Sequence, residues 1–218
     1  MTTVLKLGGS VVTEKGDPET VDRAALERAA DALAGRGNIV VVHGGGSFGH
    51  HHAAKYGVST TEGTGDPAAI RAIHGAMRRL NAAVVEALAE AAVPALPVHP
   101  MSAADRDENG DLTLPTGQVE TMLEEGFVPV LHGDGVVHTG KGATVLSGDE
   151  LVAVLAEALG ADRVGVCSAV ERTVAPLPVW TTPSPWSTGT NPSSSIVSTC
   201  PVGSVRSPFS SRSAADIG

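Results

Sequence analysis

The sequence is poor in cysteine and has no long apolar run. Its two cysteines, Cys167 and Cys200, cannot build the disulfide framework of a small secreted domain, so they favour a reducing compartment. No apolar stretch approaches the roughly 20 residues that a membrane-spanning helix needs. No signal peptide is expected, because Lys6 and two glycines interrupt the first apolar run. We therefore expect a cytoplasmic protein without a membrane partner.

Positive charge is scarce as well. The formal net charge is −9, and lysine occurs only at positions 6, 15, 55 and 141. This balance argues against a nucleic-acid partner, because such proteins carry a basic surface. The acidic, lysine-poor composition, rich in Ala and Gly, favours GC-rich DNA and leaves a high-salt habitat open. With so few lysines, the pair Lys6 and Lys15 near the N-terminus indicates a functional site.

What the sequence does contain is a regular alternation of strand-like and helix-like segments. At 218 residues, of which 42% are hydrophobic, the chain can bury the core of one domain. β-Branched runs predict strands, and apolar residues at i, i+3, i+4 and i+7 predict helices. The expected strands are 3–7, 39–42, 93–98, 128–131 and 163–167. One expected helix ends near residue 34, two more span 66–92 and 118–125, and a fourth follows residues 148–149. A hairpin tip is expected at 109–111. Residues 1–168 are therefore predicted to form an α/β fold with a mainly parallel sheet.

Glycine-rich turns follow the first two expected strands. The first reads Lys6-Leu7-Gly8-Gly9-Ser10, and the second reads His43-Gly44-Gly45-Gly46-Ser47, where Ser47 is expected to cap a helix. A right-handed βαβ crossover puts both turns at the carboxyl edge of a parallel sheet. Glycine lets bare N–H groups approach a ligand, and a helix N-terminus favours an anion. The pair of turns therefore predicts a phosphate site.

Each glycine turn taken alone is weak evidence, since an ordinary tight turn would look the same. Neither has the spacing of a P-loop or of a dinucleotide-binding motif. Two such turns on adjacent strands fit phosphoryl transfer, which needs aligned phosphates and positive charge from lysines, amides and magnesium. The run His50-His51-His52 does not predict a metal site, because adjacent helical side chains point about 100° apart.

Four short motifs lie at the ends of expected strands. They are Lys-Leu-Gly-Gly-Ser at 6–10, His-Gly-Gly-Gly-Ser-Phe-Gly-His at 43–50, His-Gly-Asp at 132–134 and Ser-Gly-Asp at 147–149. Together they resemble the amino acid kinase superfamily, and within it the isopentenyl phosphate kinases, over residues 3–168. The resemblance implies a three-layer αβα sandwich, usually a homodimer, that transfers the γ-phosphate of ATP to isopentenyl phosphate in isoprenoid biosynthesis by an alternative mevalonate pathway. The histidine at position 50 is the most specific element, because relatives that act on carboxylates or on UMP generally lack it.

The resemblance also implies a role for each matching residue. Lys6 would stabilise the moving phosphoryl group, His50 would bind the acceptor's phosphate, and Asp149 would orient the lysines. The implied catalytic residues are Lys6, Lys15, His50 and Asp149, the implied ATP-binding residues are Lys6, Leu7, Gly8, Gly9, Ser10 and Gly46, and the implied acceptor-binding residues are Gly45, His50 and Gly133. Magnesium would be held mainly by the ATP phosphates and water, without a protein ligand.

The last quarter of the sequence, residues 169–218, breaks the pattern. It is rich in Ser, Thr and Pro, and from residue 170 on it has no lysine and only five charged residues. The superfamily's Asp-Val-x-Gly-Val-type turn and its Asp-Val-Thr-Gly-Gly-Met stretch, which the resemblance assigns to the adenine site and a second catalytic cation, have no match here. A flexible tail would explain this composition. We favour a shifted reading frame near residue 169, because the acidic bias disappears with the periodicity, and we expect the 218-residue chain to be inactive or very weak.

Two other functions stay open from the sequence. One is a different member of the superfamily, which would phosphorylate a carboxylate or a phosphonate. The other is a non-catalytic phosphate-binding remnant, which would suit the unmatched C-terminal part. Assays with alternative acceptors separate the first from the leading reading, and ATP binding measured by calorimetry separates the second.

Overall fold

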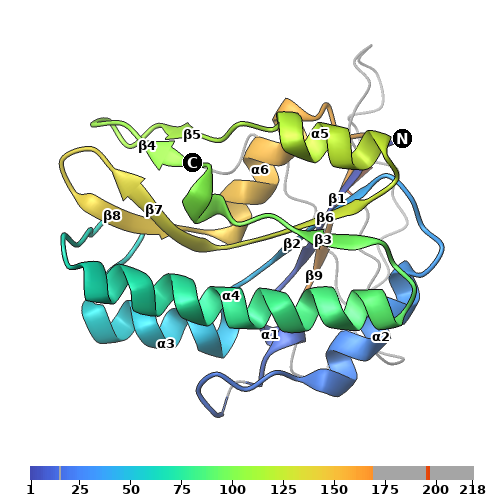
Figure 1. Cartoon of the computed structure of the whole chain (residues 1–218), viewed down its shortest axis with the longest axis horizontal. Coiled ribbons are helices and arrows are strands. Elements are labelled where there is room, and N and C mark those ends of the chain that lie inside the picture. The colour runs from blue at the N-terminus through green and yellow to red at the C-terminus, as the bar shows by residue number, and fades with distance from the viewer. Residues whose placement is uncertain (15, 169–194, 197–218) are drawn as a thin grey trace, which may run out of the picture.

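The computed structural model describes residues 1–14, 16–168 and 195–196 (Figure 1). Within these residues the centre of the fold is a six-stranded sheet in the order β10-β9-β1-β2-β6-β3, and every neighbouring pair is parallel. Its strands are β1 (Thr3–Leu7), β2 (Ile39–His43), β3 (Ala95–Pro97), β6 (Val128–His132), β9 (Arg163–Cys167) and β10 (Ser195–Ile196). The parallel sheet predicted from the alternation is confirmed, and β3 forms its edge.

Helices cover both faces of this sheet and make a three-layer sandwich (Figure 1). One side carries α1 (Gly9–Val12), α2 (Arg23–Leu33), α3 (Gly46–Tyr56) and α4 (Pro67–Glu90), and the other carries α5 (Gly117–Glu124) and α6 (Gly148–Ala158). Side chains along a strand point alternately to the two faces of the sheet, and each face has its own apolar core. In β2, Val41 packs with α2 and α4, whereas Val40 and Val42 pack with α5 and α6. The predicted αβα architecture is confirmed.

The long helix α4 follows its sequence signals closely. The Asp66 carboxylate accepts a hydrogen bond of 2.8 Å from the Ala68 N–H, and Pro67 occupies the first turn, where its missing N–H costs nothing. The apolar stripe faces the core, with Ile73, Met77, Leu80, Val84 and Leu88 all buried. The same face also buries a polar residue, Asn81, which becomes important at the site.

A smaller four-stranded sheet, in the order β5-β4-β7-β8, extends from one end of the sandwich. Its strands are β4 (Asp105–Arg106), β5 (Leu112–Thr113), β7 (Asp134–His138) and β8 (Gly142–Leu146), and the 3₁₀ turn η1 (Pro100–Ser102) precedes them. The expected tip between β4 and β5 is confirmed, with Gly110 at φ 90°. Strand β7 was not expected, because Gly133 and Gly135 at its start look like turn residues. Its antiparallel pairing with β8 overrides that local preference.

Part of the predicted C-terminal break falls on described residues. Ser195–Ile196 form β10, which lies parallel to β9. Residues 169–194 and 197–218 lie outside the described residues, and so does Lys15. In the part of the chain that is described, no helix is both long and apolar enough to cross a membrane.

Candidate active site

The two predicted glycine corners meet at the carboxyl edge of the central sheet. Strands β1 and β2 are parallel neighbours in a register that puts Leu7 beside His43, so the corners begin at the same level. A Cβ atom added to Gly9 would lie 2.5 Å from the Cα atom of Gly46, and one added to Gly44 would lie 2.8 Å from the Gly9 nitrogen. Backbone therefore contacts backbone here, and a side chain at either position would push the corners apart.

Helix α3 starts from the second corner. Gly45 occupies the position before the helix, and Gly46 begins it with φ 46°. The prediction that Ser47 caps this helix is wrong, because Ser47 lies inside it. The Ser47 N–H donates to the Thr13 hydroxyl (3.0 Å), and the Ser47 hydroxyl donates to the Thr20 carbonyl (3.4 Å). The positive end of the helix dipole thus lies at the corner, where an anion is favoured.

A lysine and an aspartate form an ion pair at the same edge. The Lys6 Nζ lies 2.5 Å from the Asp149 Oδ1, and the side chains are 13% and 72% exposed. Asp149 is held in the first turn of α6, whose start is capped by the Ser147 hydroxyl accepting from the Glu150 N–H (3.1 Å). Because one partner is so exposed, the pair adds little to stability. It does fix the direction in which the lysine ammonium points.

The third corner, His132-Gly133-Asp134, packs against the second one. The Gly133 N–H donates to the His43 carbonyl at 3.2 Å. A Cβ on Gly133 would lie 3.1 Å from the Leu146 carbonyl oxygen, and one on Gly148 would lie 3.4 Å from the His43 carbonyl oxygen. The ends of β1, β2 and β6 and the start of α6 therefore converge at one point.

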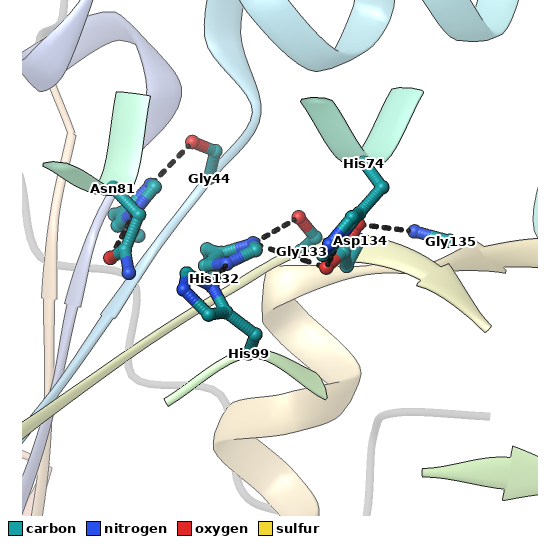
Figure 2. A network of polar contacts seen from close by, with 9 residues as sticks. Gly44, His74, Asn81, His99, His132, Gly133, Asp134 and Gly135 are labelled. Atoms are coloured by element: carbon teal, nitrogen blue, oxygen red, sulfur yellow. Dashed lines mark hydrogen bonds and ion pairs between the residues drawn. The ribbon is translucent and has the colours of Figure 1, made fainter. Parts of the chain in front are cut away.

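Behind the corners runs a chain of four histidines, of which His43 and His132 are buried and His74 and His99 are half-buried (Figure 2). The Nε2 of His43 lies 3.1 Å from the Asn81 side-chain oxygen, and the Nε2 of His132 lies 2.9 Å from the Nδ1 of His99. At the far end, the His74 Nδ1 lies 2.8 Å from the Asp134 carboxylate. The strands β2 and β6, the helix α4, the start of β7 and His99, which directly precedes η1, each contribute to this network.

Burial determines whether the rings of His43 and His132 carry a charge, because it lowers their pKa values. Loss of solvent lowers the pKa of His43 to about 4, although its hydrogen bonds to Gly44 and Asn81 oppose the shift. Burial also lowers the pKa of His132 well below its ordinary value, helped by the neighbouring His43. Burial raises the pKa of Asp134, and its hydrogen bond from His74 opposes that rise. At neutral pH, His43 and His132 are therefore uncharged.

The structure brings most of the predicted site residues together. Lys6, Gly9, Gly46 and Asp149 meet at the sheet edge with Gly133 behind them. His50 lies in the second turn of α3, and its side chain is exposed. His52, two residues on, instead bonds Glu19 at 2.6 Å. Cys167 is buried in the core, as expected.

Sequence reasoning missed His43, His132 and Asn81. The two histidines were part of the predicted motifs, but only the glycines after them received a role. Their signal was that each one ends a buried strand immediately before a glycine. Asn81 gave no signal except that it stood on the apolar side of a helix.

The acidic groups of the site do not form a metal cage. Within the described ranges, no three His, Cys, Asp or Glu side chains are placed to hold a metal ion together. Magnesium commonly binds through substrate phosphates and water with few protein ligands.

Comparison with known proteins identifies the class to which this fold and site belong. The model of the amino acid kinase family matches residues 1–172. The chain therefore belongs to the amino acid kinase family. Among its relatives, the isopentenyl phosphate kinase of Haloferax volcanii is 64% identical over 170 residues, which are 77% of this chain and 68% of that protein.

A second relative and a solved structure are also similar to this chain over about three quarters of its length. The isopentenyl phosphate kinase of Methanocaldococcus jannaschii is 34% identical over 178 residues, covering 75% of this chain and 67% of that protein. A solved structure described as isopentenyl phosphate kinase superposes with a TM-score of 0.73 at 31% identity and covers 78% of this chain and 74% of that one. The chain thus spans about two thirds of the curated relatives' length.

Proposed function

We propose that this protein is a kinase that uses ATP to phosphorylate isopentenyl phosphate, giving isopentenyl diphosphate and ADP. The observation that carries the proposal is the Lys6–Asp149 pair, set where the glycine corners of β1, β2 and β6 converge. The high identity to isopentenyl phosphate kinases supports the choice of acceptor. The product would enter isoprenoid biosynthesis.

In this reaction an oxygen of the acceptor's phosphate forms a bond to the γ-phosphorus of ATP, and the bond to the bridging oxygen of ADP breaks. The protein's part is to align the two phosphates and to offset their charge. Lys6 and Lys15 stabilise the moving group, and Asp149 keeps Lys6 aimed at it. Leu7, Gly8, Gly9, Ser10 and Gly46 line the donor side, and Gly45, Gly133 and His50 line the acceptor side. A magnesium ion bound to ATP would supply further positive charge.

His50 distinguishes a phosphate acceptor from a carboxylate. An imidazole can donate a hydrogen bond to a dianionic phosphate at neutral pH, and the exposure of His50 leaves it accessible to an acceptor. The test is to follow phosphate transfer from radiolabelled ATP to isopentenyl phosphate, acetylglutamate and a phosphonate. We expect weak but measurable transfer to isopentenyl phosphate by the 218-residue chain, and its loss in His50→Ala. Preferred transfer to either other acceptor would contradict the proposal.

The matched control is His51→Ala, because His51 is also exposed but neighbours His50 on a different side of α3. This variant should keep transfer close to that of the unchanged chain. An equal loss in both variants would mean that substitution disturbs α3, not that His50 binds the acceptor.

We also propose that residues 169–218 come from a shifted reading frame and that residues 1–168 form the evolved domain. The family match ends at residue 172, close to the point where the sequence changes character. Sequencing the DNA around codon 169 tests this directly. A frame that is intact in every reading would refute it.

Finally, we propose that the protein works in the cytoplasm as a homodimer. The edge strand β3 lies beside a groove of about 800 Å³ that Ala82, Val85, Ala89, Pro97 and His99 line on α4 and the end of β3. An uncovered sheet edge beside such a groove suits a second copy of the chain. Light scattering coupled to size exclusion should give twice the chain mass, and a single-chain mass would contradict it.

A further inference from the structure

His43 and His132 occupy equivalent places on neighbouring strands. Each is the last residue of its strand, β2 or β6, and the register pairs one with the other. Both are 0% exposed, and their rings stack with centroids 5.4 Å apart. In each ring the Nδ1 lies close to the carbonyl oxygen of the following glycine, at 3.1 Å for Gly44 and 3.0 Å for Gly133. Two adjacent strands thus repeat the same local hydrogen bond at the site.

These contacts determine which ring nitrogen carries the proton. A carbonyl oxygen can only accept, so Nδ1 must donate in both rings. Because both rings are neutral, each Nε2 must then accept. The His99 Nδ1–H meets this need for His132 at 2.9 Å. Both histidines are therefore in the Nδ1–H form.

Asn81 can donate a hydrogen bond to the His43 Nε2 once its side-chain amide is rotated. As placed, its side-chain oxygen faces the His43 Nε2, and its buried Nδ2 has no partner within the described residues. The oxygen and nitrogen of an amide are assigned from such networks. A half-turn of the amide brings the Nδ2–H onto Nε2 and removes the conflict of two acceptors. The only arrangement that satisfies His43 is thus one in which Asn81 donates.

The bonded carbonyls lie at the corners that contact substrate in the proposed function. A trans peptide is planar, and its C=O and N–H point in opposite directions. Tying the Gly44 carbonyl to His43 therefore turns the Gly45 N–H away from the ring, and tying the Gly133 carbonyl to His132 orients the Gly133–Asp134 peptide in the same way. Glycine corners have no side chains to hold them and would otherwise sample many conformations.

We propose that His43 and His132 are positioning residues, whose Nδ1–H bonds to Gly44 and Gly133 hold the peptide planes of the acceptor corners ready for a phosphate. This inference rests on the proposed function for the identity of the acceptor. The tethers reduce the ordering that binding would otherwise have to supply. Their effect should be larger on the acceptor than on ATP, because the tethered peptides Gly44–Gly45 and Gly133–Asp134 adjoin the proposed acceptor residues, whereas most donor residues follow β1, whose corner contains no such histidine.

The first test reads the proton position directly and does not depend on kinase activity. Long-range ¹H–¹⁵N correlation spectra of the full chain at neutral pH should show His43 and His132 as Nδ1–H tautomers. The amide signal of Gly45 should shift when inorganic phosphate is added. Nε2–H tautomers at either position would overturn the proposal.

The second test separates the tether from simple packing. His43→Leu fills the space but removes the donor, whereas His43→Asn keeps an N–H close to the Nδ1 position. By calorimetry on the full chain, His43→Leu should weaken isopentenyl phosphate binding about tenfold, and His43→Asn should recover most of it. ATP affinity should change less than about twofold in both. Equal loss for both ligands, or no recovery in the Asn variant, would overturn the proposal.

His138 provides the matched control. Its Nδ1 makes the same bond to the next carbonyl, that of Thr139, at 2.7 Å, and it is nearly as buried. It lies at the other end of β7, about 13 Å from the corner at the usual rise of a strand. His138→Leu should leave acceptor affinity unchanged, and a loss equal to that of His43→Leu would overturn the proposal. If the unchanged chain binds no isopentenyl phosphate, the proposed function fails, and the tautomers and the Gly45 shift still decide the inference.

Discussion

At the scale of single residues, the Lys6–Asp149 pair shows how the site separates activity from stability. The Asp149 side chain is 72% exposed, so replacing it costs the fold little. In the proposed function, its carboxylate orients the ammonium that would offset charge in the transition state. Function and stability therefore depend on different features of this contact.

We expect Asp149→Asn to slow phosphoryl transfer roughly tenfold or more, because an amide holds the lysine less firmly than a carboxylate. The melting temperature should stay within about 2 °C of the unchanged chain. Rapid-quench measurement of transfer, together with thermal unfolding, tests both statements. As a control, Asp162→Asn removes another exposed carboxylate, paired with the N-terminus, and should not affect transfer. A large fall in melting temperature with unchanged transfer would contradict this account.

The buried His43 makes stability depend on pH. Its pKa is about 4 in the folded protein and near 6.5 when unfolded, so the unfolded chain takes up the proton first as pH falls. The free energy of unfolding should therefore decrease from about pH 6.5 towards about pH 4. Asp134, whose pKa is raised by burial, works in the opposite sense, so the comparison must be made between variants.

Denaturant unfolding of the unchanged chain and of His43→Leu between pH 7 and pH 5 tests this. We expect a flatter pH dependence in the variant, since the group that binds the extra proton on unfolding is gone. His138→Leu serves as the reference for replacing another histidine of the same kind. Identical slopes in the unchanged chain and His43→Leu would mean that His43 does not titrate as described.

At the scale of structural elements, the contact between the corners of β1 and β2 is the most constrained feature. We expect Gly9→Ala to abolish or nearly abolish transfer, because its methyl group would lie 2.5 Å from the backbone of Gly46 and force the corners apart. Gly37→Ala is the control, since a methyl group there meets nothing within 4 Å. Transfer assays and thermal unfolding of both variants test this. Full activity in Gly9→Ala would show that the corners need not touch.

The sequence predicted an element correctly where its apolar residues followed a single pattern, either that of a helix or that of a buried strand. The apolar stripe of α4 and the β-branched run of β2 have a single reading, and both are buried as expected. Strand β7 and the role of Ser47 were misread, because pairing with β8 and the contact with Thr13 come from residues far away in the chain. The bonds from His43 and His132 to the next carbonyl are local, but their purpose depends on how the strands lie side by side.

At the scale of the whole molecule, the proposed acceptor residues Gly45, His50 and Gly133 all lie within residues 1–168. The motifs without a match are ones that the resemblance assigns to the adenine site and a second catalytic cation. A chain with its frame restored after codon 168 should therefore gain ATP affinity and turnover but keep the same affinity for isopentenyl phosphate. Calorimetry with each ligand and a steady-state assay test this. Full turnover by the 218-residue chain would refute the shifted-frame proposal.

The sheet order has a consequence for how the chain is made. Strand β1 leaves the ribosome well before β9 (Arg163–Cys167), which is one of its two partners in the sheet. Until those residues are synthesised, an apolar strand from the centre of the sheet keeps one hydrogen-bonding edge open. The nascent chain should therefore depend on chaperones through most of its translation and lose that dependence once β9 closes against β1.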